Sequence, residues 1–384
     1  MSMTRAQWAA GSGLRSAIDA ALIMAIGMGF GRFAFTAIYP HMVEEQVLSL
    51  RGGSLAASAN YAGYLLGALL AVRARAHNAH RLCLWAMTGT AVCLAALAVI
   101  DSMVLIVAIR GIAGVFSALA MVAASLWLLE HRQQLHRAPL LYAGVGIGIA
   151  LSAELLVLGT HLGLHSQGLW LLLGGVSLLI GLTAAPGLLT SGKMPAALPP
   201  DTTQADSRIV RQLPLVAIYG LAGFGYIITA TYLPLLITTA LPGLNATHVW
   251  ALFGLGAAPS CFLWHRVRQR LGVRHALAAN LGVQALGVVF PVLAPSTLSY
   301  LLSALLVGGT FMGVVTIAMP AAQRVSRQTG KNLIATMTLV YGVGQILGPI
   351  VANALFAASQ SFNSSLLTAA AALAVAAALS LQVL

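Results

Sequence analysis

Three ionisable residues lie inside strongly apolar stretches of the sequence. Arg32, Arg110 and Glu154 are each flanked by runs of Ala, Leu, Ile, Val and Gly. A charge in the middle of a membrane costs about 2.5–3.5 kcal/mol or more, so such residues usually mark a binding site or a proton pathway. Guanidinium groups bind anions, and a buried carboxylate beside them can exchange a proton. The three residues therefore predict an anion-attracting site with Glu154 as the proton-coupling group.

Polar residues at helical spacing extend the predicted site. Thr36 and Tyr39 follow Arg32 at i+4 and i+7, so they share one helix face with it. In the second half of the chain we expect uncharged groups to complete an asymmetric substrate site: Tyr226, Thr229, Tyr341 and Gln345. Two alternatives stay open. The tyrosines can serve packing alone, and the charged residues can form a permanent cluster that never meets substrate.

The composition makes lipid the main solvent of the chain. Of 384 residues, 59% are hydrophobic and 7% are charged, whereas soluble domains are about 25% charged. A membrane helix needs about 20 mostly apolar residues. Twelve candidate spans can be placed, and Asp19 falls near the start of the first, where a helix dipole favours a carboxylate. They are 17–39, 52–72, 82–100, 103–128, 139–160, 167–185, 212–238, 247–265, 273–294, 297–320, 332–356 and 362–383.

The basic residues alternate between the two sides of these spans. Seventeen of the 20 lysines and arginines fall before the first span or in every second connection, and the opposite connections hold only Arg51. This is the pattern of the positive-inside rule for an even number of spans with both termini in the cytoplasm. The net charge of +12 is therefore a topology signal, and no nucleic-acid partner is expected. We expect a multi-pass protein of the cell membrane, such as a bacterial inner membrane.

The first span of each half carries the same pattern. The sequence GFG at 29–31 recurs 194 positions later at 223–225, Pro40 recurs as Pro234, and Arg32 falls opposite Tyr226. Duplicated halves are typical of transporters that hold their site between the halves, although glycine-rich helices can also look alike by chance. The polar stretch 187–211 reads as a cytoplasmic linker. The predicted domains are therefore residues 1–186, the linker 187–211, and residues 212–384.

Several blocks resemble the major facilitator superfamily, and within it the YbfB/YjiJ branch. The blocks are GMGFGRFAFTAIYPHM, RGIAGVFSALA, YAGVGIGIALSAELL, YGLAGFGYIITATYLPLLI and YGVGQILGPI. The resemblance implies an all-α integral membrane protein with twelve transmembrane helices in two pseudo-symmetric six-helix bundles. It also implies that the first and fourth spans line a central cavity. RGIAG at 110–114 is similar to the fourth-span signature associated with proton coupling in antiporters.

The sequence departs from this superfamily at its charged signature. The usual run is G-x-L-x-D-R-x-G-R-R between the second and third spans. Here Ala71 stands at the place of the aspartate, and Gln269 stands at the acidic place of the second half. The cytoplasmic charge lock that the signature suggests is therefore in doubt for this chain.

Together these patterns predict a secondary transporter that works by alternating access. We expect it to move a small organic solute, anionic or amphiphilic, with coupling to protons. No cofactor is expected, because the chain has no G-x-x-x-x-G-K-[ST] loop and its histidines lack metal-site spacing. No enzyme activity is expected, since only one carboxylate lies deep. The alternative is a non-transporting receptor or assembly subunit with a transporter-like fold.

Overall fold

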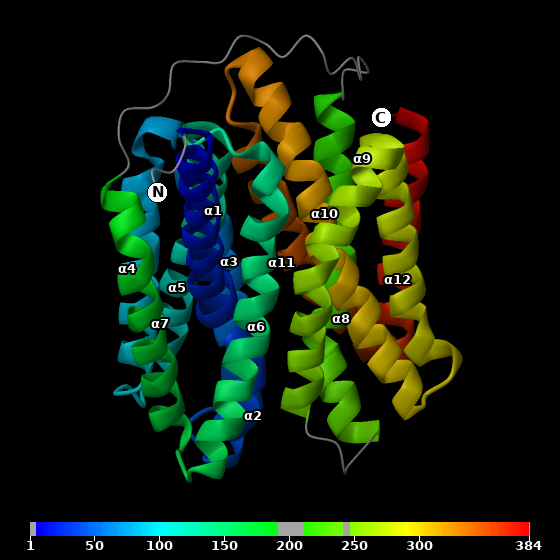
Figure 1. The fold of residues 1–384 in the computed structure, drawn as a ribbon. Coiled ribbons are helices and arrows are strands. Elements are labelled where there is room, and N and C mark those ends of the chain that lie inside the picture. Colours follow the sequence, from blue (N-terminus) through cyan, green and yellow to red (C-terminus); the bar gives the residue numbers. More distant parts are fainter. Residues whose placement is uncertain (1–4, 191–210, 241–245, 384) are drawn as a thin grey trace.

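The computed structural model describes residues 5–190, 211–240 and 246–383, and most of these residues are helical. Figure 1 shows the helices side by side in one bundle. In chain order they are α1 (Arg5–Met24), η1 (Ala25–Phe33), α2 (Ala34–Glu44), α3 (Leu50–Ala71), η2 (Ala76–Asn78), α4 (Ala79–Leu97), α5 (Met103–Ser125), η3 (Leu126–His131), η4 (Leu135–Arg137), α6 (Ala138–His161), α7 (Ser166–Leu189), α8 (Gln212–Ala240), α9 (Ala246–Leu293), α10 (Thr297–Thr329), α11 (Leu333–Ser359) and α12 (Asn363–Val383).

Ten helical stretches of the described residues are long and apolar enough to cross a membrane. The first of them joins α1, η1 and α2 over Gly13–Glu44, and α3 is not among the ten. Helix α9 is counted once although it has 48 residues. The chain is therefore a multi-pass membrane protein, and the count of twelve spans stays a prediction.

Helix α9 is not a straight rod. A helix of its length would extend about 72 Å, more than twice the roughly 30 Å hydrocarbon core of a bilayer. Its backbone leaves helical geometry at Gly272, with φ 74° and ψ 176°. This positive φ favours glycine, because other residues are strained there. Figure 1 shows the chain turning back near this point.

Most predicted helix limits agree with the observed limits within a few residues. The clearest difference is α1, which begins at Arg5 instead of near residue 17. Asp19 therefore lies well inside α1, and the helix-dipole interpretation of Asp19 is wrong. Its buried carboxylate pairs instead with Arg15, one turn earlier, with 3.0 Å between the Arg15 Nε and Asp19 Oδ1 atoms.

Glycines let the helices cross at backbone distance in both halves of the chain. A Cβ atom at Gly144 of α6 would overlap the carbonyl group of Ala21 in α1. A Cβ atom at Gly344 of α11 would overlap the carbonyl oxygen of Gly220 in α8. Small residues permit this close approach of membrane helices. The α1–α6 and α8–α11 crossings are thus built in the same way.

The segment η1 is a π-helix of nine residues, all of them buried. Such helices are rare, usually span a single turn and often occur at functional sites. This one contains the run of alternate glycines and Arg32. It places Arg32 between α1 and α2, deep in the bundle.

Helices from the two ends of the sequence meet along two seams. Helix α3 packs against α11, and α6 packs against α9. In the second seam a Cβ atom at Gly146 would crowd the backbone of Ala258. Figure 1 shows the helices α1 to α7 on one side and the helices α8 to α12 on the other. The predicted two-bundle division stays a proposal, and most of its linker, 191–210, lies outside the described residues.

Candidate functional site

A chain of hydrogen bonds joins three of the predicted site residues. The Nη2 atom of Arg32 donates to Oε1 of Gln345 at 2.7 Å. The amide nitrogen of Gln345 in turn donates to the Tyr226 hydroxyl. These residues come from η1, α11 and α8, and each is almost fully buried. Packing therefore unites residues that are up to 313 positions apart in the sequence.

Aromatic rings surround the Arg32 guanidinium. Its Cζ atom lies 4.2 Å from the ring centroid of Tyr64 and 5.2 Å from that of Tyr61. A cation within about 6 Å of an aromatic centroid is attracted by the ring quadrupole. Beyond Gln345, the ring of Tyr226 stacks between Phe311 and Tyr341, with centroids 5.3 and 5.5 Å away. The site is thus a cation enclosed by aromatic side chains.

Among the described residues, Arg32 has no acidic partner. The ion pairs of the described residues involve Asp19, Glu44, Glu45 and Glu154, and none of them includes Arg32. The Nε and Nη1 atoms of Arg32 are buried and make no hydrogen bond. Unpaired buried charge is strongly unfavourable. The arrangement therefore favours an anion that would take the unused N–H groups.

Arg110 has a different environment from Arg32. Its Nη1 atom donates to the carbonyl oxygen of Gly31 at 2.8 Å, and its Nη2 atom to that of Arg32 at 3.2 Å. Ser117 donates to the carbonyl of Gly27 at 2.6 Å. Side chains of α5 thus satisfy carbonyls of the π-helix, where regular helix hydrogen bonding is disturbed. In this conformation Arg110 holds η1 in place, and its contact with substrate stays a prediction.

The comparison with protein families bears on this arrangement. The model of the family described as "Uncharacterised MFS-type transporter YbfB" matches residues 24–381, nearly the whole chain. The chain belongs to this family. The match confirms the major facilitator resemblance, the membrane character and the expectation that the chain is not an enzyme. Among curated proteins, none matches the sequence.

Glu154 of this MFS-type transporter lies away from both arginines. Its side chain is about half exposed, and its Oε1 atom lies 3.0 Å from Nδ1 of His248. The pair links α6 to α9, across one of the two seams. We expected the carboxylate beside Arg32 and Arg110, but the described contacts of Glu154 are with the histidine. Its role in proton coupling stays a prediction.

The remaining predicted residues occupy several environments. Tyr341 stacks on Tyr219 with centroids 4.6 Å apart, in addition to Tyr226. Thr229 is buried, and its hydroxyl makes no hydrogen bond. Tyr39 is half-buried and stacks on Phe35, whose ring also covers the Arg110 guanidinium. Thr36 is half-buried on the same helix, α2.

The sequence analysis missed several residues of the transporter's site. Tyr61 and Tyr64 had a usable signal, since they stand one helical turn apart in the second predicted span. The histidines were considered only as metal ligands, although His248 is the partner of Glu154. No pattern in the sequence marked Phe311 or Trp250 as part of the site. The Trp250 indole N–H donates to the Phe33 carbonyl at 3.2 Å, so it joins α9 to the end of η1.

The central site is closed in this conformation. Arg32 is 3% exposed. Two pockets described in the structure lie elsewhere. One is lined by η4, α9, α10 and the connection before η4, and the other by η3, α10 and the connections at 74–75 and 330–332. An anion can therefore reach Arg32 only after the helices around it move.

Proposed function

We propose that this transporter moves a small organic anion, including amphiphilic ones, across the membrane by alternating access. The observation that carries the proposal is the buried Arg32 guanidinium. Two of its nitrogen atoms lack hydrogen-bond partners, and no carboxylate of the part of the chain that the structure describes pairs with it. A carboxylate matches the planar fork of a guanidinium in charge and geometry. In this proposal Arg32 binds the anionic group of the substrate.

The neighbours of Arg32 have distinct roles in the proposal. Gln345 and Tyr226 orient the guanidinium, and Tyr341 forms the aromatic wall beside them. The unpaired hydroxyl of Thr229 is a further donor for the substrate. Arg110, Thr36 and Tyr39 are proposed to line the path that opens toward the site. Because Arg32 and Gln345 come from different halves, their hydrogen bond must break when the halves separate.

The proposed topology has twelve spans in two six-helix bundles, residues 1–186 and 212–384, with the linker 187–211 between them. Two observations support the count. Helix α3 has 22 residues, which is long enough to cross a membrane. The break at Gly272 divides α9 into two helical segments. The alternation of basic residues supports cytoplasmic termini, and the proposed location is a bacterial inner membrane.

Proton coupling is proposed to act through Glu154. The contact between Glu154 and His248 joins α6 to α9, and it is an ion pair when the carboxylate is charged and the histidine is protonated. Protonation of Glu154 would weaken this contact and favour separation of the helices. We expect Glu154→Gln to flatten the pH dependence of transport, while the exposed control Glu44→Gln leaves it unchanged. An unaltered pH profile in Glu154→Gln would remove this residue from the coupling step.

The direct test is a flux assay in proteoliposomes with an imposed pH gradient. The panel pairs aromatic and aliphatic carboxylates with their neutral amides and with amines of similar size. We expect gradient-dependent flux for at least one carboxylate and none for its amide. Flux of amines alone would overturn the anion assignment. An absence of gradient-dependent flux across the panel would favour the receptor or assembly-subunit alternative.

A further inference from the structure

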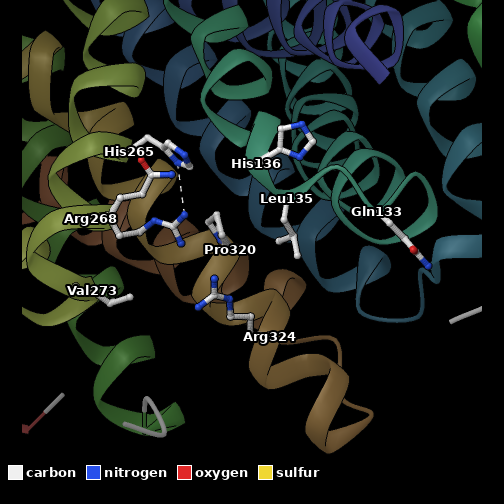
Figure 2. A pocket seen from close by; sticks show the side chains of 10 residues that line it. Gln133, Leu135, His136, His265, Arg268, Val273, Pro320 and Arg324 are labelled. Atoms are coloured by element: carbon white, nitrogen blue, oxygen red, sulfur yellow. Dashed lines mark hydrogen bonds between the residues drawn. The ribbon is translucent and has the colours of Figure 1, made fainter. Parts of the chain in front are cut away.

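A basic cavity whose lining does not include Arg32 opens elsewhere in the molecule, and we call it the basic pocket. It has a volume of about 610 Å³, within the range of small-molecule sites. Figure 2 shows its side chains arranged around a common space. It is lined by Gln133, Leu135, His136, His265, Arg268, Gln269, Gly272, Val273, Pro320 and Arg324.

The basic pocket lies between parts of the chain that are far apart in sequence. One wall is the connection from η3 to η4, and the other is formed by α9 and α10. Beside it, Arg327 of α10 donates to the carbonyl of Leu129 in η3 at 3.3 Å, so the two walls already touch. Gln134 of the same connection lies against Gly13 in α1. The pocket is thus at the end of the molecule where the basic connections gather.

The lining of the basic pocket contains cations and no acids. Arg268 and Arg324 point into the same space in Figure 2, with His265 next to Arg268 and His136 on the opposite wall. The Arg268 Nη2 atom lies 3.4 Å from Nδ1 of His265. The Nε atom of Arg268 is buried without a hydrogen-bond partner. Two guanidinium groups that share a cavity repel each other, and a bound anion would relieve that repulsion.

We propose that the basic pocket is a second anion-binding site, separate from the transport site at Arg32. Arginine forks bind phosphate and carboxylate oxygens in pairs, and two forks with two histidines suit a ligand with at least two negative charges. The shared chemistry is a phosphate or polycarboxylate group, carried by a soluble anion or by an anionic lipid headgroup. Because the pocket is lined by the connection from η3 to η4 on one side and by α9 and α10 on the other, its ligand would stabilise the conformation described here.

The first experiment titrates pyrophosphate into the purified full-length protein in neutral detergent and follows the thermal midpoint. We expect a saturable rise for the wild type and at least a tenfold weaker response for Arg268→Gln and Arg324→Gln. The control is Arg266→Gln, which removes the same charge from an exposed position of α9 outside the pocket. Equal loss in the control would overturn the proposal, because binding would then depend only on net charge.

A second arm separates the two sources of the anion. The protein is placed in nanodiscs of phosphatidylcholine with or without phosphatidylglycerol, and retained lipid is measured by native mass spectrometry. Retention that Arg324→Gln abolishes identifies a lipid headgroup, whereas pyrophosphate binding without lipid retention identifies a soluble anion. Binding of neither probe to the wild type would overturn the proposal. Arg32→Gln should keep full binding in both arms. A result against the basic pocket is therefore distinguishable from a result against the transport site.

Discussion

The first span and its counterpart α8 share one packing design but differ in helix type and in the residue at one position. In both, glycines bring the helix against a glycine-rich partner, Gly144 of α6 in one case and Gly344 of α11 in the other. In the first span the chain forms a π-helix and carries Arg32. In α8 it stays α-helical and carries Tyr226 at the equivalent place.

This difference distinguishes the residues that pack the helices from the residues that form the site. The glycines occur in both halves, so they are explained by helix packing alone. The charge and the π-helix occur in one half, and Arg110 and Ser117 are committed to carbonyls of that segment. The two halves then meet where Arg32 binds Gln345. The features found in one half, Arg32 and the π-helix, therefore indicate the site, and the glycines found in both halves belong to the scaffold.

The largest expected effect comes from substitutions at the glycines where the helices cross. Gly144→Val and Gly344→Val should each abolish the yield of folded protein, because a Cβ atom at either site overlaps a backbone carbonyl. The controls are Gly175→Val and Gly282→Val, where an added Cβ meets no atom within 4 Å. The measurement is the monodisperse fraction after size exclusion. Tolerance of one substitution but not the other would show that the crossings are not equivalent.

The next prediction concerns a substitution that gives Arg32 a neighbouring carboxylate. Gln345→Glu places a carboxylate 2.7 Å from the guanidinium, at the site of the present amide oxygen. Anion flux should fall at least tenfold, equivalent to about 1.4 kcal/mol, while the thermal midpoint stays unchanged or rises because the buried charge is paired. Gln360→Glu, at the exposed end of the same helix, is the control. Unchanged flux in Gln345→Glu would contradict an anion site at Arg32.

Arg110 should behave as a support of the π-helix. In Arg110→Gln the shorter side chain cannot reach both carbonyls, and one carbonyl left without a donor costs about 1–3 kcal/mol. We expect a lower thermal midpoint with a KM for the transported anion that is nearly normal. The exposed Arg81→Gln, in α4, should change neither quantity. A raised KM with a normal midpoint would instead place Arg110 in contact with substrate.

The smallest effect concerns the connection that follows the first span. Both oxygens of Glu45 accept from the backbone N–H of Ser166, at 3.1 and 2.9 Å, at the start of α7. Partial burial raises the pKa of Glu45, but these hydrogen bonds and His165 outweigh it, so the pKa lies below its ordinary value of 4.5.

The sign of the resulting pH dependence follows from this shift. A lowered carboxyl pKa contributes stability above the ordinary value, and the contribution is lost as the pH falls through the folded-state pKa. Glu45→Gln should therefore lower the thermal midpoint slightly at pH 7, and the difference from wild type should disappear in acid below pH 4.5. Glu44→Gln is the neighbouring control. A difference that persists in acid would exclude the charge of Glu45 as its cause.

Local patterns in the sequence predicted the helices well, because hydropathy and helix length depend on neighbouring residues. The site was harder to predict. Arg32, Arg110 and Glu154 each lie in an apolar stretch, but the sequence does not fix the direction in which a helix face points. Only packing places Glu154 against His248 and Arg32 against Gln345. The π-helix could not be predicted from the local sequence either, because two of its carbonyl groups accept hydrogen bonds from side chains of α5.

The central claim is tested most directly by ligand-induced stabilisation of the purified protein. Wild type, Arg32→Gln and the pocket variant Arg324→Gln are heated with benzoate or succinate, and with the matching neutral amides. The account predicts that a carboxylate raises the midpoint of the wild type and of Arg324→Gln, that its amide does not, and that Arg32→Gln loses the response. An undiminished carboxylate response in Arg32→Gln would contradict it.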